Sequence, residues 1–110
     1  MNTLRNKVQL IGNLGNNPDV ITLDSGKKCA KFNMATNEHY KNAQGEKVTD
    51  TQWHQIVAWG KTADIIEQFA TKGKEVTVSG KLTTRQWQDK EGHTRYTTEV
   101  LCQEILLLGK

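Results

Sequence analysis

The chain has little of what interrupts a fold or cross-links it. Its 110 residues include one proline, two cysteines and nine glycines, and the formal net charge is only +3. A composition so poor in proline contains no low-complexity linker, and the length suits one domain over residues 1–110. Because the overall charge is nearly balanced, a surface for a polyanion would have to come from cations clustered locally.

Long apolar segments are also missing. No apolar run is longer than Ile105–Leu108, which is far below the length needed to cross a bilayer. Met1–Lys7 has no apolar stretch of the kind that a signal peptide contains. We therefore expect a cytoplasmic protein without a membrane partner.

Cysteines and histidines are few and scattered. Cys29 and Cys102 form no C-x-x-C pair, so we expect two small buried side chains in a reducing compartment. A disulfide or redox role is the alternative. His39, His54 and His93 have no ligand spacing, which predicts no metal site and no cofactor.

Alternation of polar and apolar residues predicts β-structure along most of the chain. The polar segment 38–50 indicates a long loop or a projecting hairpin, and residues 88–94 are typical of a hairpin tip. Residues 20–23 allow one more short strand. The main strands are expected at residues 7–12, 30–36, 53–59, 76–87 and 95–107.

One helix is expected between the third and fourth of these strands. Thr62 suits its N-cap, Asp64 suits the dipole in its first turn, and Gly73 suits its C-terminal end. A single short α-helix at this place predicts an all-β fold, a five-stranded OB-fold barrel with long projecting hairpin loops. The apolar face of the helix consists of Ile65, Ile66, Phe69 and Ala70.

Strand parity separates the expected core from a second surface, because neighbouring side chains in a strand point to opposite faces. Val76, Val78 and Leu82 share the parity that would fill the barrel. The other parity of this strand is polar and cationic apart from one tryptophan, and consists of Thr77, Lys81, Thr83, Arg85 and Trp87.

The strand at 53–59 carries apolar residues on both faces. Trp53 and Trp59 share one parity, whereas Ile56 and Ala58 have the other. Such a strand is expected where the core covers one face and a ligand or partner subunit covers the other. Nucleobases suit exposed indole rings, because stacking contributes about 1–3 kcal/mol per base and tolerates any sequence. Tryptophans in the core, with cations on an ordinary solvated face, remain the alternative on these patterns alone.

Cations that would hold phosphates accompany the aromatics along the chain. Lys41 and Lys47 lie beside Tyr40 in the polar segment. The remaining candidates are Lys61, Lys72, Lys74, Lys81, Arg85 and Lys90.

Short motifs along nearly the whole chain have a specific order and spacing. They are Asn6-Lys7-Val8, Gly12-Asn13-Leu14-Gly15 with Pro18, Ala35-Thr36, Trp53-His54 with Gly60-Lys61, Lys72-Gly73, Gly80-Lys81-Leu82, Thr84-Arg85 with Trp87, and Arg95-Tyr96-Thr97-Thr98-Glu99-Val100. Together they resemble the DNA-binding domain of the bacterial single-stranded DNA-binding proteins. The resemblance implies a non-catalytic OB-fold that binds and protects single-stranded DNA without sequence specificity, in replication, recombination and repair.

The resemblance also implies residue roles. Bases would stack on Trp53, Trp59 and Trp87, and on Tyr40, which holds the place of an aromatic that is often Trp in relatives. Gln86 stands where relatives often have Lys, which removes one phosphate contact. The phosphate-binding cations of the family fall on Lys61, Lys72 and Arg85. With Lys81 and Lys41 from the patterns above, the expected DNA-binding set is Trp53, Trp59, Trp87, Tyr40, Lys61, Lys72, Arg85, Lys81 and Lys41.

A homotetramer is implied as well, with His54 at the subunit interface. Relatives usually continue into a flexible tail whose acidic, Phe-containing tip recruits replication and repair enzymes. Because this sequence stops at Leu108-Gly109-Lys110, recruitment through such a tail is not expected. Either a truncated chain or a short natural variant would stop there.

Two other functions find less support. An enzyme is disfavoured because the sequence has no Gly-rich phosphate loop, no Ser/His/Asp order and no carboxylate pair near a base. An OB-fold assembly protein that contacts mainly proteins would share the barrel, but it need not keep Trp53, Trp59 and Trp87.

Overall fold

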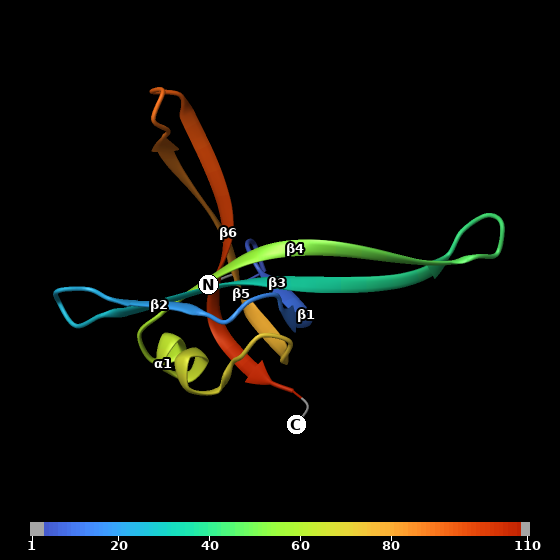
Figure 1. Ribbon diagram of the computed structural model, residues 1–110, viewed down its shortest axis with the longest axis horizontal. Coiled ribbons are helices and arrows are strands. Elements are labelled where there is room, and N and C mark those ends of the chain that lie inside the picture. Colours follow the sequence, from blue (N-terminus) through green and yellow to red (C-terminus); the bar gives the residue numbers. More distant parts are fainter. Residues whose placement is uncertain (1–3, 109–110) are drawn as a thin grey trace.

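The computed structural model describes residues 4–108 as six β-strands and one α-helix (Figure 1). Met1–Thr3 and Gly109–Lys110, the chain ends considered above, lie outside these residues. No helix within 4–108 is long and apolar enough to span a membrane. The elements in chain order are β1 (Val8–Leu14), β2 (Asp19–Thr22), β3 (Lys28–Lys41), β4 (Lys47–Trp59), α1 (Gly60–Phe69), β5 (Glu75–Gln88) and β6 (Thr94–Leu107).

The strands form one sheet in the order β1-β5-β6-β4-β3-β2. A second pairing of β1, with β3 at Asn13–Ala35, closes five of them into a barrel. The pairing of β4 with β6 is parallel and includes Ile56–Val100, whereas the other pairings are antiparallel. The predicted five-stranded OB-fold barrel with its single helix between the third and fourth barrel strands is therefore confirmed. The optional short strand exists as β2, which pairs with β3 at the sheet edge.

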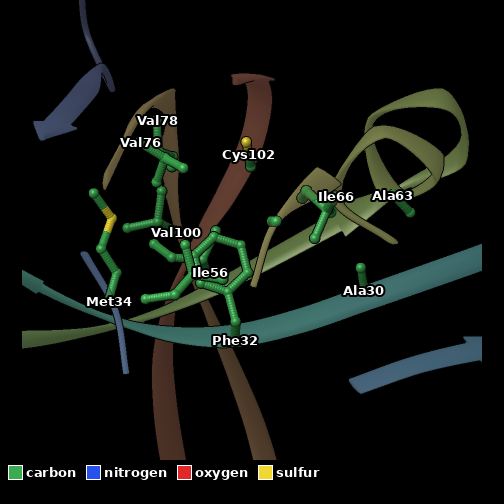
Figure 2. Packing of buried hydrophobic residues seen from close by; sticks show 13 residues of the cluster. Ala30, Phe32, Met34, Ile56, Ala63, Ile66, Val76, Val78, Val100 and Cys102 are labelled. Carbon is green, nitrogen blue, oxygen red and sulfur yellow. The ribbon is translucent and has the colours of Figure 1, made fainter. Parts of the chain in front are cut away.

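The barrel interior is built from alternate residues of the strands, as the pleat requires (Figure 2). Phe32 and Met34 of β3 meet Ile56 of β4, and Val76 and Val78 enter from β5. Each of these side chains is buried. Helix α1 adds Ala63, Ile66 and the adjoining Ala70 to the same cluster.

The helix begins and ends earlier than predicted. It starts at Gly60, directly after β4, because a glycine φ of 62° lets the chain turn from strand into helix without a loop. Trp59 is the N-cap residue and provides no side-chain hydrogen bond, so the prediction of a Thr62 cap is wrong. The C-cap is Ala70, whose N–H donates to the carbonyl of Ile66.

Two further helix predictions need correction. Gly73 lies in the turn after the helix with φ 88°, and its N–H donates to the carbonyl of Leu14 at 2.8 Å. That bond ties the loop after the helix to β1, so this glycine serves the turn and not the helix cap. Asp64 lies beyond the first turn and accepts from Lys28 Nζ at 2.9 Å.

Two long antiparallel hairpins project from the barrel, as predicted (Figure 1). One is formed by the distal ends of β3 and β4, and the other by those of β5 and β6. The expectation that Leu82 fills the barrel is wrong, because this side chain is 48% exposed. After Gly80, where the register with β6 shifts, β5 leaves the barrel and both of its faces become accessible.

Candidate nucleic-acid interface

The pairing register shows which way the tryptophans of β4 point. Trp53 lies opposite Ala35 and Trp59 opposite Cys29, whereas the core residue Ile56 lies opposite Phe32. Paired residues project to the same side of a sheet, so both indoles point away from the barrel interior. Their exposed fractions, 63% for Trp53 and 38% for Trp59, agree with that placement.

The same surface continues across β6 onto β5. Val57 of β4 pairs with Leu101 of β6, which pairs in turn with Lys81 of β5. From Lys81 onward, every second residue of β5 has this orientation, which places Arg85 and Trp87 on the same sheet surface. We call this surface the outer face; it carries Trp53, Val57, Trp59, Lys81, Arg85 and Trp87.

Trp53 is held against the backbone of a glycine. A Cβ added at Gly15 would lie 2.4 Å from Cζ3 of Trp53, so only glycine leaves room for the ring where it is. The N–H of Gly15 donates to the carbonyl of Asn33 at 2.7 Å, which ties this loop to β3. One part of the indole therefore rests on a fixed backbone while most of the ring stays open to solvent.

Trp87 and Trp59 are positioned in different ways. Trp87 Nε1 donates to Thr97 Oγ1 on the neighbouring strand at 2.9 Å, which satisfies the ring's only donor and leaves 42% of the residue exposed. Trp59 has the Nζ of Lys27 at 5.0 Å from the ring centre, a cation–π distance. All three indoles thus have defined orientations before any ligand is present.

Arg85 is the outer-face cation with a fixed partner. Its Nε lies 3.4 Å from Oε1 of Glu99, a carboxylate that is only 7% exposed, while the Arg85 side chain remains about half exposed. Oε2 of Glu99 is buried without a protein hydrogen-bond partner among the described residues. The salt bridge fixes the guanidinium on the sheet but leaves part of its fork open to an anion.

The other predicted cations are exposed and lie in separate places. Lys61 is the second residue of α1, two positions after Trp59, and Lys81 lies where β5 leaves the barrel. The backbone N–H of Lys72 donates to Oδ1 of Asn17 at 2.9 Å, so its turn adjoins the loop on which Trp53 rests. Lys41 lies at the distal end of β3, opposite Lys47. The predicted cations therefore lie on elements that adjoin those of the indoles, and Lys41 lies far along one hairpin.

Tyr40 and His54 do not share the orientation of the tryptophans. Tyr40 is 54% exposed and has the parity of Phe32, so it leaves the hairpin from the side opposite to that of Trp53. His54 has the same inward parity, is half-buried, and has its Nε2 3.0 Å from Thr36 Oγ1. Their predicted roles in stacking and in a subunit interface remain predictions.

Two more outer-face residues lie between the tryptophans and are not in the predicted DNA-binding set. Lys31 pairs with Val57, and Gln55 pairs with Asn33. Together with Asn33, Asn16 and Asp19 they line a hollow of about 150 Å³. The alternation of residues 30–36 contains the signal, because the positions between the apolar ones must point outward.

The tip of the β5–β6 hairpin brings together three potential metal ligands. Atoms of Asp89, Glu91 and His93 lie within 4.8 Å of one another. Oδ2 of Asp89 already accepts from Arg95 at 2.9 Å, and its Oδ1 accepts two backbone N–H groups. The Arg95 bond and then the His93 N–H bond lower the pKa of Asp89. These contacts shape the turn, so the group is explained without a metal.

Cys29 and Cys102 are both free and buried, as expected. Burial raises the pKa of both thiols, that of Cys102 to about 11. Both side chains are therefore protonated at neutral pH and act as small apolar groups.

The barrel topology defines the class of this protein as an OB-fold domain. A model of the Single-strand binding protein family matches residues 5–108, and the chain belongs to that family.

Known relatives and a solved structure agree with this assignment. The chain is 46% identical over 105 residues to Single-stranded DNA-binding protein 1 of Chlorobaculum tepidum, covering 94% of this chain and 65% of that protein. It is 42% identical over 106 residues to Single-stranded DNA-binding protein 1 of Xylella fastidiosa, covering 96% of this chain and 78% of that protein. This chain thus spans slightly less than two thirds of the first relative.

The structural comparison covers the domain from end to end. The Plasmodium falciparum SSB, solved in complex with ssDNA, matches with a TM-score of 0.87 and 34% sequence identity. The match covers 99% of this chain and 100% of that chain. The fold of the domain is therefore the fold of that protein.

Proposed function

We propose that this chain binds single-stranded DNA without sequence specificity and protects it by stoichiometric coating. The observation that carries the proposal is the outer face, where Trp53, Trp59 and Trp87 present oriented and partly exposed indole rings. Family membership and the likeness to a protein solved with ssDNA support it. The three indoles do not belong to the cluster of buried residues that fills the barrel, so their exposed faces remain available to a ligand.

Stacking supplies affinity that is independent of sequence. Each base placed on an indole contributes about 1–3 kcal/mol, whichever base it is. Trp53 and Trp59 are six residues apart on one strand, which corresponds to about 20 Å along β4. An extended strand would therefore place non-adjacent bases on the two rings, and the bases between them would lie over Gln55 and Val57.

Phosphate contacts supply the rest of the affinity and make it dependent on salt. Arg85 has the same orientation as Trp87 two positions along β5, and Lys61 follows Trp59 by two positions at the start of α1. The turn of Lys72 adjoins the loop under Trp53. Tyr40 and Lys41 would extend the path along the projecting hairpin. Lys81 would contact a phosphate of the bound strand at the point where β5 leaves the barrel.

The bound strand is expected to leave unchanged, because coating has no chemical step and needs no cofactor. Incubation of labelled single strands with the protein and magnesium should return strands of full length. A cleaving activity that stays with the protein through ion exchange and gel filtration would argue for an enzyme instead.

The assembly proposed is a homotetramer in the cytoplasm that serves replication, recombination and repair, with His54 near a subunit contact. Solution mass, measured by light scattering with and without oligo-dT, tests the assembly and the ligand together. A monomer at micromolar concentration would contradict the tetramer but not the binding.

Tryptophan fluorescence tests the binding itself. Adding poly-dT at low salt should strongly quench the emission, because stacked bases contact the indole rings directly. Double-stranded DNA of the same concentration is the control and should quench far less, since its bases are already stacked on one another. Unchanged emission with poly-dT at low salt would contradict the proposed function and favour a protein-contacting OB-fold.

A further inference from the structure

Two adjacent lysines at the start of β3 have opposite surroundings. Lys28 Nζ lies 2.6 Å from Glu67 Oε1 and 2.9 Å from Asp64 Oδ1, so its charge is neutralised by α1. Hydrogen bonds to Glu67 and then to Asp64 raise the pKa of Lys28, so its charge is firmly held. Lys27 takes part in none of the ion pairs within residues 4–108, and its Nζ lies over the ring of Trp59 instead.

The turn that carries Lys27 has a defined geometry. The N–H of Leu23 donates to the carbonyl of Lys27 at 2.8 Å, and the N–H of Gly26 donates to the carbonyl of Leu23 at 2.8 Å. Gly26 has φ 89°, which a residue with a side chain rarely adopts. The turn between β2 and β3 lies at the end of the molecule opposite to the β3–β4 hairpin (Figure 1). From this turn the Nζ of Lys27 reaches the ring of Trp59.

The ammonium group and a base would compete for the same place. A cation held at 5.0 Å from the ring centre occupies the space that a stacked base needs. Trp59 is also the least exposed of the three tryptophans, at 38% against 42% and 63%. A base can thus stack on this face only if Lys27 moves away, and the tether of the turn keeps the displaced cation near the phosphate of the stacked nucleotide.

We propose that Lys27 is a DNA-contacting residue with two positions. It covers the Trp59 ring in the free protein, and it moves to a backbone phosphate when a base stacks there. The inference rests on the proposed function and adds a residue and a step to it. Lys28, which has the same charge one position away, is excluded from this role because Asp64 and Glu67 hold it.

The affinity of Lys27→Ala and Lys28→Ala for oligo-dT, measured over a tenfold range of salt, tests the phosphate contact. One lost phosphate contact should make the slope of log Kd against log salt shallower by about 0.7 in Lys27→Ala only. That variant should bind more weakly than the unchanged chain at low salt. At high salt the difference in affinity between the two chains should vanish or reverse, because phosphate contacts are then weak and the Trp59 ring of Lys27→Ala is already uncovered.

A single-tryptophan chain tests the covering of the ring. With Trp53→Phe and Trp87→Phe, emission comes from Trp59 alone, and acrylamide quenching measures access to that ring. In the DNA-free protein, Lys27→Ala should raise the quenching constant, whereas Lys28→Ala should leave it unchanged. With oligo-dT bound, the Lys27→Ala chain and its parent should agree, because a base then covers the ring in both.

The outcomes separate this inference from the proposed function. If the unchanged chain binds oligo-dT and Lys27→Ala has the same salt slope, Lys27 contacts no phosphate and the inference is wrong. Equal losses of slope in Lys27→Ala and Lys28→Ala would show a general charge effect, which also overturns it. Failure of the unchanged chain to bind oligo-dT at low salt would instead refute the proposed function, and this inference with it.

Discussion

Both sides of β4 carry apolar residues, but one side is buried in the barrel and the other is largely exposed. Ile56 and Ala58 are completely buried in the barrel, while Trp53 and Trp59 on the other side keep 63% and 38% of their surface exposed. Because the side chains alternate, stabilising residues and candidate binding residues are interleaved along one strand. Hydrophobicity alone therefore does not identify the core of this domain, and the two sides should respond differently to substitution.

β5 shows the same division along its length. Val76 and Val78 are fully buried, whereas Arg85 and Trp87, beyond the register shift at Gly80, lie on an exposed arm. A Cβ at Gly80 would lie 1.9 Å from the carbonyl oxygen of Leu101, so the strands approach closely at the point where the arm begins. The arm can therefore carry polar and aromatic groups that the barrel would not accept.

The largest expected effect is on stability, at the inner side of β4. Ile56→Ala should lower the free energy of unfolding by about 2–5 kcal/mol, because it leaves a cavity in a closed core. Denaturant titration measures this. Gln55→Ala, one residue away on the outer face, is the control and should change stability by less than about 0.5 kcal/mol. Equal losses would mean that the two sides are not independent.

The next effect is on binding, at the outer side. Trp53→Ala and Trp87→Ala should each weaken binding to oligo-dT by about 1–3 kcal/mol while unfolding stays nearly unchanged. Isothermal titration calorimetry measures the free energy of binding, and denaturant titration on the same samples measures the free energy of unfolding. Tyr96→Ala is the matched control, since Tyr96 is 69% exposed but pairs with Gln86 on the opposite side of the arm. A loss as large for Tyr96 would remove the distinction between the sides.

A smaller effect is expected where the backbone supports a ring. Gly15→Ala should displace Trp53 from its position and weaken binding, though by less than Trp53→Ala does, because the indole is moved but not removed. The affinity of the double variant provides the check. In the Trp53→Ala background, Gly15→Ala should cause no further loss of binding. Additive losses would show that Gly15 acts independently of the ring.

The smallest effect concerns acid and the tip of the exposed arm. Bonds to Arg95 and to backbone N–H groups lower the pKa of Asp89, so its ionised form favours the folded tip. That contribution is complete above the usual Asp range, about 3.9, and is lost as the pH falls through the lower folded value. Protection of the tip amides, measured as the exchange rate relative to the intrinsic rate at each pH, should therefore fall in acid. Asp89→Asn should show the low protection already at neutral pH.

Glu91→Gln is the control for the tip. It removes a charge from the same turn but leaves the bonds to Asp89 in place. Its amide exchange should follow that of the unchanged chain at every pH. If Asp89→Asn behaves like this control, the carboxylate does not organise the tip.

Much of the fold could be predicted because its signals are local. Alternation with period two located the strands, put Trp87 on the polar side of its strand and gave Trp53 and Trp59 a common side. The structure decides that this common side is the outer one. The prediction failed for Leu82, because alternation does not show where a strand leaves the barrel. It failed for Thr62 as an N-cap, because the bend at Gly60 starts the helix without one.

The sequence by itself determined the barrel, the presence of its helix and the shared parity of Trp53 and Trp59, because alternation and turn residues act over a few neighbours. Only the tertiary structure decided what lies beside each ring: Gly15 under Trp53, Thr97 on Trp87 and Lys27 over Trp59. Such neighbours depend on strand register and on the path of turns between distant segments. For that reason Lys27 and Lys28 look equivalent in the sequence, although the helix neutralises Lys28 and Lys27 lies over the ring of Trp59.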